Sequence, residues 1–305
     1  MNMKKYIIAS VAAVLVAATS AAQSLPFTAV DYDPAGLAKG GASLLQTSSF
    51  AFASTANPAA VPFAEASADF SAVYSMWSPK GVKSNVMGVA GAYNIKEKFG
   101  VSAGFTYGMN PSYDIYDQAG AAKGSFRPSD MQVKAGFAYR FIPSLSVGVN
   151  AGYASSSLAE GVSYGAFTSD VFLMGSFSGF KVAAGVADLG TGVVAASGAK
   201  FQLPTRGVVA LGYGADFAEK HQVNFEVDAE YAFYGAFSAA FGAEYGFNDM
   251  IFARAGYRYG GNSVLPSFAS VGAGVKVAGI KMNVAYLLAN DLIGNTLSIS
   301  LGYSF

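Results

Sequence analysis

The sequence contains no cysteine and only one histidine, His221, among its 305 residues. Without cysteine there are no disulfide bridges and no thiol chemistry, and without a cluster of cysteines and histidines a zinc site has no ligands. His221 follows Glu219 and Lys220 in a stretch expected to form a turn. A turn histidine is usually a solvated surface group, whereas a general base needs a protected site near its nucleophile. The sequence therefore predicts no enzymatic activity, no metal and no cofactor.

Charged residues are also scarce, at 12% of the chain, and the 19 basic and 19 acidic side chains balance to a net charge of +0. A nucleic-acid partner would require a basic patch, so none is expected. Hydrophobic residues make up 52% of the chain. After the first 22 positions, however, no run reaches the roughly 20 mainly apolar residues of a membrane-spanning helix. The apolar residues must therefore serve another kind of structure.

The first 22 residues have the organisation of a signal peptide. Lys4 and Lys5 form a positive start, residues 6–18 form a short apolar core, and the small residues from Ser20 to Ala22 precede a cleavage site. We expect residues 1–22 to be removed, leaving Gln23 as the first residue of an exported protein.

From residue 67 onward the chain repeats one pattern, in which apolar residues occupy every second position for about ten residues before a turn. Near the end of the chain, for example, Leu297, Ile299 and Leu301 alternate with serines. Successive side chains of a strand point to opposite faces, so each segment has one apolar face and one small, polar face. The predicted strands span residues 67–77, 84–94, 99–108, 131–141, 145–154, 163–175, 179–187, 203–214, 221–231, 236–246, 250–259, 267–277, 280–288 and 296–305.

The polar face of these segments favours a membrane barrel over a soluble sandwich. A sandwich covers its outer face with charge, whereas here glycine, serine, alanine and asparagine dominate, which suits a crowded lumen behind a lipid-facing wall. The tight connections alternate with longer ones, such as 109–130 and 188–202, as expected for periplasmic turns and outer loops. We therefore predict an all-β fold, a transmembrane antiparallel β-barrel of about 14 strands over residues 67–305, in the cell outer membrane.

Residues 23–66 lack sustained alternation and contain several prolines and glycines. One interpretation is a disordered periplasmic leader. The other is a plug inside the barrel, because Leu44, Phe50 and Phe52 are too apolar for a solvated tail and a barrel of this size has a wide interior unless it is filled. We favour the plug.

Charged residues on the predicted inward faces lie on neighbouring strands, which are about 4.8 Å apart. Two interpretations remain open: an ion-pair ladder that neutralises itself and anchors the plug, or a polar constriction that selects solutes. The predicted ladder comprises Glu226, Asp228, Glu230, Glu244, Arg254 and Arg258, and further inward positions are Lys134, Arg140, Lys181, Lys276 and Lys281.

Short motifs in the N-terminal part resemble those of the PorV/PorQ family of Bacteroidota, relatives of the FadL long-chain fatty-acid transporters. The motifs are Gly40-Gly41-Ala42, then an aromatic stretch with Phe50 and Phe52, then Asn57-Pro58-Ala59 just before the first strand. The C-terminal residues 302–305 also resemble the end of these proteins and barrel-assembly signals in general, which gives Tyr303 and Phe305 that role. The resemblance implies a fourteen-strand barrel with an N-terminal plug, recognised by the barrel-assembly machinery.

Three functions are compatible with this resemblance. The first is transport of small apolar or amphipathic solutes across the outer membrane. The second is an accessory or cargo-binding barrel in a type IX-like secretion system, with a secreted protein as partner. The third is a structural protein whose lumen is sealed. In each case outer-membrane lipid is an expected partner.

Overall fold

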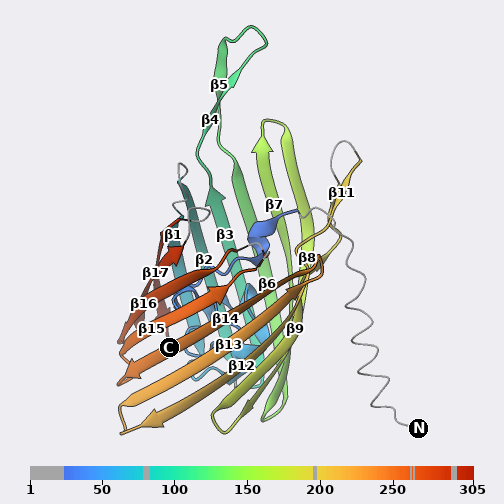
Figure 1. Cartoon of the computed structure of the whole chain (residues 1–305). Helices are drawn as coiled ribbons and strands as arrows, with labels where there is room; N and C mark the ends of the chain where they lie inside the picture. Colours follow the sequence, from blue (N-terminus) through green and yellow to red (C-terminus); the bar gives the residue numbers. More distant parts are fainter. Residues whose placement is uncertain (1–23, 78–82, 195–197, 262, 264, 290–293) are drawn as a thin grey trace, which may run out of the picture.

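The computed structural model describes residues 24–77, 83–194, 198–261, 263, 265–289 and 294–305; the predicted signal peptide, residues 1–22, lies outside them. Fourteen antiparallel strands close into a barrel, each paired with the next barrel strand along the chain, and β1 also pairs with β18 (Figure 1). The barrel strands are β1 (Ala68–Trp77), β2 (Ser84–Ile95), β3 (Phe99–Met109), β6 (Ser129–Ile142), β7 (Leu145–Ala159), β8 (Val162–Phe177), β9 (Phe180–Gly190), β12 (Arg206–Phe217), β13 (His221–Ala232), β14 (Ala236–Phe247), β15 (Ile251–Tyr259), β16 (Phe268–Val277), β17 (Ile280–Ala289) and β18 (Thr296–Ser304). The predicted fold class is confirmed.

The two faces of the barrel wall differ as the alternation predicts. Outward side chains such as Val209, Leu211 and Leu301 are more than half exposed. Every Asp, Glu, Lys and Arg of the described barrel strands occupies an inward position. A wall that is apolar outside and polar inside is suited to hydrocarbon. None of the helices among the described residues is long and apolar enough to span a membrane.

The two ends of the barrel carry different connections, as predicted. We call them the turn end and the loop end. At the turn end, Asn248 and Asp249 have φ values of 57° and 51°, which is the geometry of a tight hairpin turn. At the loop end, the two long connections contain small hairpins that alternation did not predict: β4 (Tyr113–Tyr116) with β5 (Ala122–Phe126), and β10 (Val193–Val194) with β11 (Lys200–Phe201).

The β4–β5 hairpin projects beyond the rest of the barrel (Figure 1). It is braced against the end of β7, because the Tyr113 hydroxyl donates a hydrogen bond of 3.1 Å to the carbonyl of Leu158. β7 itself continues beyond its predicted end at residue 154 to Ala159. The sequence Ser155-Ser156-Ser157 broke the apolar alternation there, but the strand ladder continues, with Ser157 opposite Ser163.

The N-terminal segment, residues 24–66, lies inside the barrel as short helical turns linked by loops (Figure 1). Its turns are η1 (Pro26–Ala29), α2 (Pro34–Leu37), η2 (Ala51–Ser54) and η3 (Pro58–Phe63). Glycines in the wall allow this close approach. A Cβ atom at Gly148 would lie 2.5 Å from the amide nitrogen of Ala59, and one at Gly256 would overlap the backbone of Lys39 and Gly40.

Candidate functional site

Carboxylates of the wall hold the backbone of the N-terminal segment. Asp228 accepts hydrogen bonds from the amides of Ser43 and Leu44, at 3.0 and 3.3 Å. Glu226 accepts one of 2.8 Å from the amide of Leu45. These side chains are nearly fully buried, so the hydrogen bonds satisfy groups that would be costly to bury alone.

Lys39 gives the segment a charged anchor. Its ammonium lies 2.5 Å from the carboxylate of Glu226, and both side chains are buried. Burial by itself lowers the pKa of Lys39, but the negative charges of Glu226 and Glu244 outweigh it, and the pKa is raised. Lys39 is therefore held as a cation in the lumen.

The predicted motifs of the N-terminal segment occupy positions where the segment meets the wall or itself. Asn57 caps η3: its side chain accepts a 2.9 Å hydrogen bond from the amide of Ala59 and donates one of 2.7 Å to the carbonyl of Leu44. The carbonyl of Ala59 accepts a bond of 2.5 Å from Ser146 of β7. Pro58 packs near Gly136.

In the other motif, Gly40 has a φ of 75° and its amide donates to Ser270 at 2.9 Å. Gly41 follows, also at positive φ, and Ala42 is fully buried. A plug role for these residues remains a prediction.

Four members of the predicted charge ladder pair with one another, and the other two contact the N-terminal segment. Arg254 lies 2.5 Å from Glu244, and Arg258 lies 2.9 Å from Glu230. Glu226 and Asp228 face the N-terminal segment instead of an arginine. Three of the further inward lysines form ion pairs: Lys281 with Asp69, Lys276 with Asp249 and Lys134 with Asp170. The other two inward residues donate hydrogen bonds to neutral groups. Lys181 donates to Thr47, and Arg140 donates to the carbonyls of Pro62 and Pro143.

Three members of the largest ionic group, Asp170, Asp188 and Arg206, were not predicted from the sequence. We call this group the ionic belt: Lys134, Asp170, Asp188, Arg206, Glu230 and Arg258. Lys134 lies 2.8 Å from Asp170 and 3.3 Å from Asp188. Arg206 pairs with Asp188 and lies 3.8 Å from Glu230. Glu230 therefore links two arginines, and the belt runs across strands β6 to β15.

Asp188 could not be placed by strict alternation. The β8–β9 register shifts between Ser169 and Val171, and Asp188 has a φ of 54°. This β-bulge turns Asp188 inward directly after the inward-facing Ala187. Asp170, by contrast, follows the alternation of β8 and could have been found from it.

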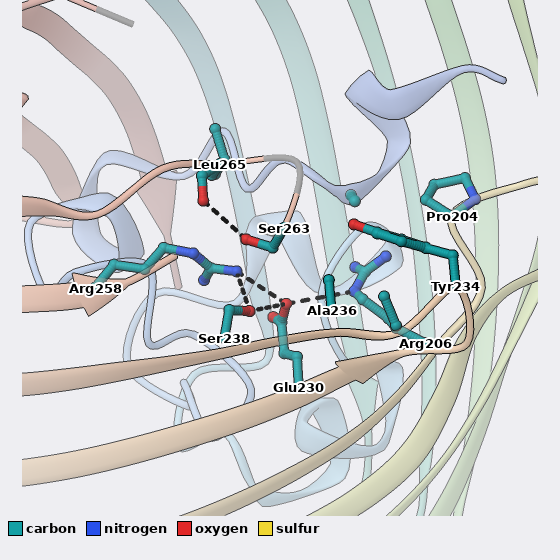
Figure 2. A pocket seen from close by; sticks show the side chains of 11 residues that line it. Pro204, Arg206, Glu230, Tyr234, Ala236, Ser238, Arg258, Ser263 and Leu265 are labelled. Atoms are coloured by element: carbon teal, nitrogen blue, oxygen red, sulfur yellow. Dashed lines mark hydrogen bonds and ion pairs between the residues drawn. The ribbon is translucent and has the colours of Figure 1, made fainter. Parts of the chain in front are cut away.

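Two small cavities lie on either side of Glu230 and its arginines. The outer cavity, near the loop end, is lined by Pro204, Tyr234 and Ser263 among others (Figure 2). The inner cavity holds about 40 Å³ between the N-terminal segment and the wall. Both cavities share the lining residues Ala29, Arg206, Glu230, Arg258 and Leu265.

The inner cavity has apolar lining residues beside its charged and polar ones. Phe172 of β8, Val208 of β12 and Phe268 of β16 face inward there, opposite Leu44 of the N-terminal segment. Phe172, Val208 and Leu44 belong to one buried apolar cluster. A water-filled pore would have a polar wall at this point.

The other predicted residues lie outside the lumen. Tyr303 and Phe305 are exposed on the outer face at the turn end, and the amide of Phe305 donates a 3.1 Å hydrogen bond to Ala68. His221 also belongs to the outer face, where its Nδ1 lies 2.6 Å from the hydroxyl of Tyr245. Among the described residues, no group of three or more His, Cys, Asp or Glu side chains could hold a metal ion.

No family model matches the sequence, and no curated protein matches it. Solved structures do match. The toluene transporter TodX of Pseudomonas putida is 14% identical with a TM-score of 0.64, over 94% of this chain and 99% of that one. The toluene transporter TbuX of Ralstonia pickettii is 13% identical with a TM-score of 0.62, over 90% and 98%. A FadL homologue of Pseudomonas aeruginosa is 10% identical with a TM-score of 0.53, also over 90% and 98%.

The chain shares the barrel fold of these proteins. At these identities the likeness is one of fold alone. The lumen of this barrel contains a segment held by wall carboxylates, an ionic belt, and two cavities that meet at Glu230.

Proposed function

We propose that this protein resides in a bacterial outer membrane and lets small apolar or amphipathic solutes pass the N-terminal segment, which acts as a plug. The observation that carries the proposal is the apolar wall of the inner cavity, at Phe172, Val208 and Phe268. The toluene transporters TodX and TbuX share the fold, which supports the same class of solute. A transport role, rather than an enzymatic one, agrees with these neighbours.

Passage requires the N-terminal segment to move. A cavity of about 40 Å³ holds about two or three water molecules, whereas a cavity known to take up benzene measures on the order of 150 Å³. Because the inner cavity is bounded by the segment at Leu44, a shift of this part of the segment is the simplest way to widen it. The third possibility raised above, a sealed lumen, corresponds to a segment that never shifts.

Uptake into proteoliposomes tests the proposal. Liposomes with a lipopolysaccharide outer leaflet, which slows the spontaneous entry of apolar solutes, should take up radiolabelled toluene faster with the intact protein than without it, while glucose uptake stays at background. Phe172→Gln, which places an amide in the apolar wall, should slow toluene uptake several-fold. The matched control is Phe252→Gln, since Phe252 also faces the lumen but lines neither cavity. Equal toluene uptake with and without protein would refute the proposal.

A second candidate is an accessory or cargo-binding barrel of a secretion system, in keeping with the PorV/PorQ resemblance of the N-terminal motifs. One observation favours it: the β4–β5 hairpin projects from the loop end and exposes Tyr116. Crosslinking from Tyr116 in whole cells, followed by mass spectrometry, tests it. Recovery of one secreted protein would support this function, and recovery of lipid alone would count against it.

A further inference from the structure

The two arginines at the meeting point of the cavities have unused hydrogen-bonding capacity. Arg258 donates through Nη2, to Glu230 and Ser238, each at 2.9 Å. Its Nη1 has no acceptor among the described residues and points towards Gly41, where an added Cβ atom would lie 3.5 Å away. Gly41 lines the inner cavity. Arg206 likewise donates through Nη1 to Asp188, and its Nη2 has no acceptor in the described part of the chain.

The charges of these arginines are already balanced. The ionic belt contains three basic side chains, Lys134, Arg206 and Arg258, and three acidic ones, Asp170, Asp188 and Glu230, and it is linked by contacts of 3.8 Å or less. Asp228 adds another buried carboxylate to the inner cavity. An anionic ligand would therefore bring an uncompensated charge into a largely buried site, which is costly.

A pure hydrocarbon is also a poor match at this point. It would cover the free N–H groups of the arginines without accepting from them, and an unsatisfied buried donor is unfavourable. A neutral molecule with one oxygen acceptor avoids both costs. Its oxygen can reach the arginines, while its apolar body lies against Phe172, Val208 and Phe268.

We infer that the inner cavity, once widened by a shift of the N-terminal segment at Leu44, is a binding site for neutral aromatic solutes that carry one hydrogen-bonding oxygen, such as aromatic alcohols and phenols, with Arg206 and Arg258 selecting them over hydrocarbons and carboxylates. This inference rests on the proposed function and specifies its substrate class. Glu230 is a positioning residue in the site, because it contacts both guanidinium groups (Figure 2), and all three residues line both cavities.

Three ligands of similar size test the selectivity: toluene, benzyl alcohol and benzoate. Binding is measured by calorimetry with the full chain in lipid nanodiscs, after subtraction of partitioning into empty nanodiscs. One net hydrogen bond corresponds to binding of benzyl alcohol about fivefold to tenfold tighter than toluene. Benzoate should bind at least about tenfold more weakly than benzyl alcohol because of its charge.

A charge-balanced double variant assigns the selectivity to the arginine site. Glu230→Gln with Arg258→Met removes one acid and one base, so the net charge of the belt is unchanged, and the preference for benzyl alcohol over toluene should fall towards one. The matched control is Glu244→Gln with Arg254→Met. This buried ion pair joins the adjacent strands β14 and β15 and lines neither cavity. This control should keep the preference. Heat-modifiable migration on gels verifies that both variants are folded barrels.

Several results would overturn the inference. The inference is wrong if toluene binds as tightly as benzyl alcohol, if benzoate binds most tightly, or if the Glu230–Arg258 double variant keeps the preference. In each of these cases, toluene uptake in the proteoliposome experiment would still support the proposed function. If none of the three ligands binds and toluene does not enter proteoliposomes, the proposed function itself fails.

Discussion

Asp31 is a single residue whose protonation is coupled to the packing of the N-terminal segment. Its Oδ1 accepts a 2.9 Å hydrogen bond from the amide of Asp33, but its Oδ2 is buried without a partner among the described residues. Burial, followed by the nearby charge of Asp33, raises the pKa of Asp31 to about 7. Asp33 is affected in the same direction, since burial raises its pKa as well.

A raised carboxyl pKa makes the folded state more stable at low pH. Between pH 3.8, the ordinary pKa, and about 7, the folded chain binds more protons at Asp31 than the unfolded chain, so stability falls as pH rises through this window. Asp31→Asn keeps the acceptor for Asp33 and removes the charge. At pH 8 we expect the variant to have a higher thermal midpoint, with a free energy of unfolding that is larger by at most about 4 kcal/mol. At pH 4 both quantities should be nearly unchanged.

The midpoints of heat-modifiable gel migration at pH 4, 6 and 8 measure this effect. Glu97→Gln serves as the control, because Glu97 is an exposed carboxylate at the turn end. A midpoint for Asp31→Asn that lies below that of the natural protein at pH 8 would show that the ionised carboxylate is stabilising.

At the scale of single residues, the sequence identified side chains that obey strand alternation and missed those that do not. Glu226, Glu230 and Arg258 face the lumen because the strands around them are regular. Asp188 was missed because the bulge that turns it inward depends on how β8 and β9 pair. Pairing partners such as Lys39 with Glu226 are 187 positions apart, and no local pattern contains that information.

At the scale of elements, alternation predicted the barrel strands because lipid contacts one face and the lumen the other along their whole length. It did not predict the β4–β5 and β10–β11 hairpins. Both project from the loop end, where neither face has to meet lipid, so their sequences carry no such alternation. The turns of the N-terminal segment were also beyond prediction, since they are short and held by the wall rather than by their own periodicity.

The contact between β15 and the N-terminal segment offers a prediction at this scale. Gly256 has no side chain where the backbone of Lys39 and Gly40 passes, so Gly256→Val should displace this part of the segment while the β14–β15–β16 pairing remains. Hydrogen exchange measured by mass spectrometry should show lost protection at residues 38–45. Gly207→Val is the matched control, because a Cβ there meets only Phe233, at 3.7 Å. Equal protection in both variants would mean that the segment is not packed against β15.

At the scale of the whole molecule, the backbone ladders that close the barrel do not involve the segment inside it. The strands close the barrel through their own ladders, including β1 with β18. The segment is attached to the wall mainly through side chains: Asp69, Glu226, Asp228, Ser146 and Ser270 bond its backbone. The wall should therefore close without the segment, and the vacated carboxylates would then be hydrated rather than buried.

Deletion of residues 24–66, behind an intact signal sequence, tests whether the segment is a plug. A fourteen-strand barrel without contents has an open lumen, so single channels in planar bilayers should show a stable conductance that the intact protein lacks. Deletion of residues 113–126 is the matched control, because the β4–β5 hairpin projects away from the lumen and its loss should leave conductance at background. Heat-modifiable migration would verify that both deletion variants form barrels. A folded 24–66 deletion variant that remains closed would show that the wall side chains seal the lumen by themselves, and the route past the N-terminal segment would have to be abandoned.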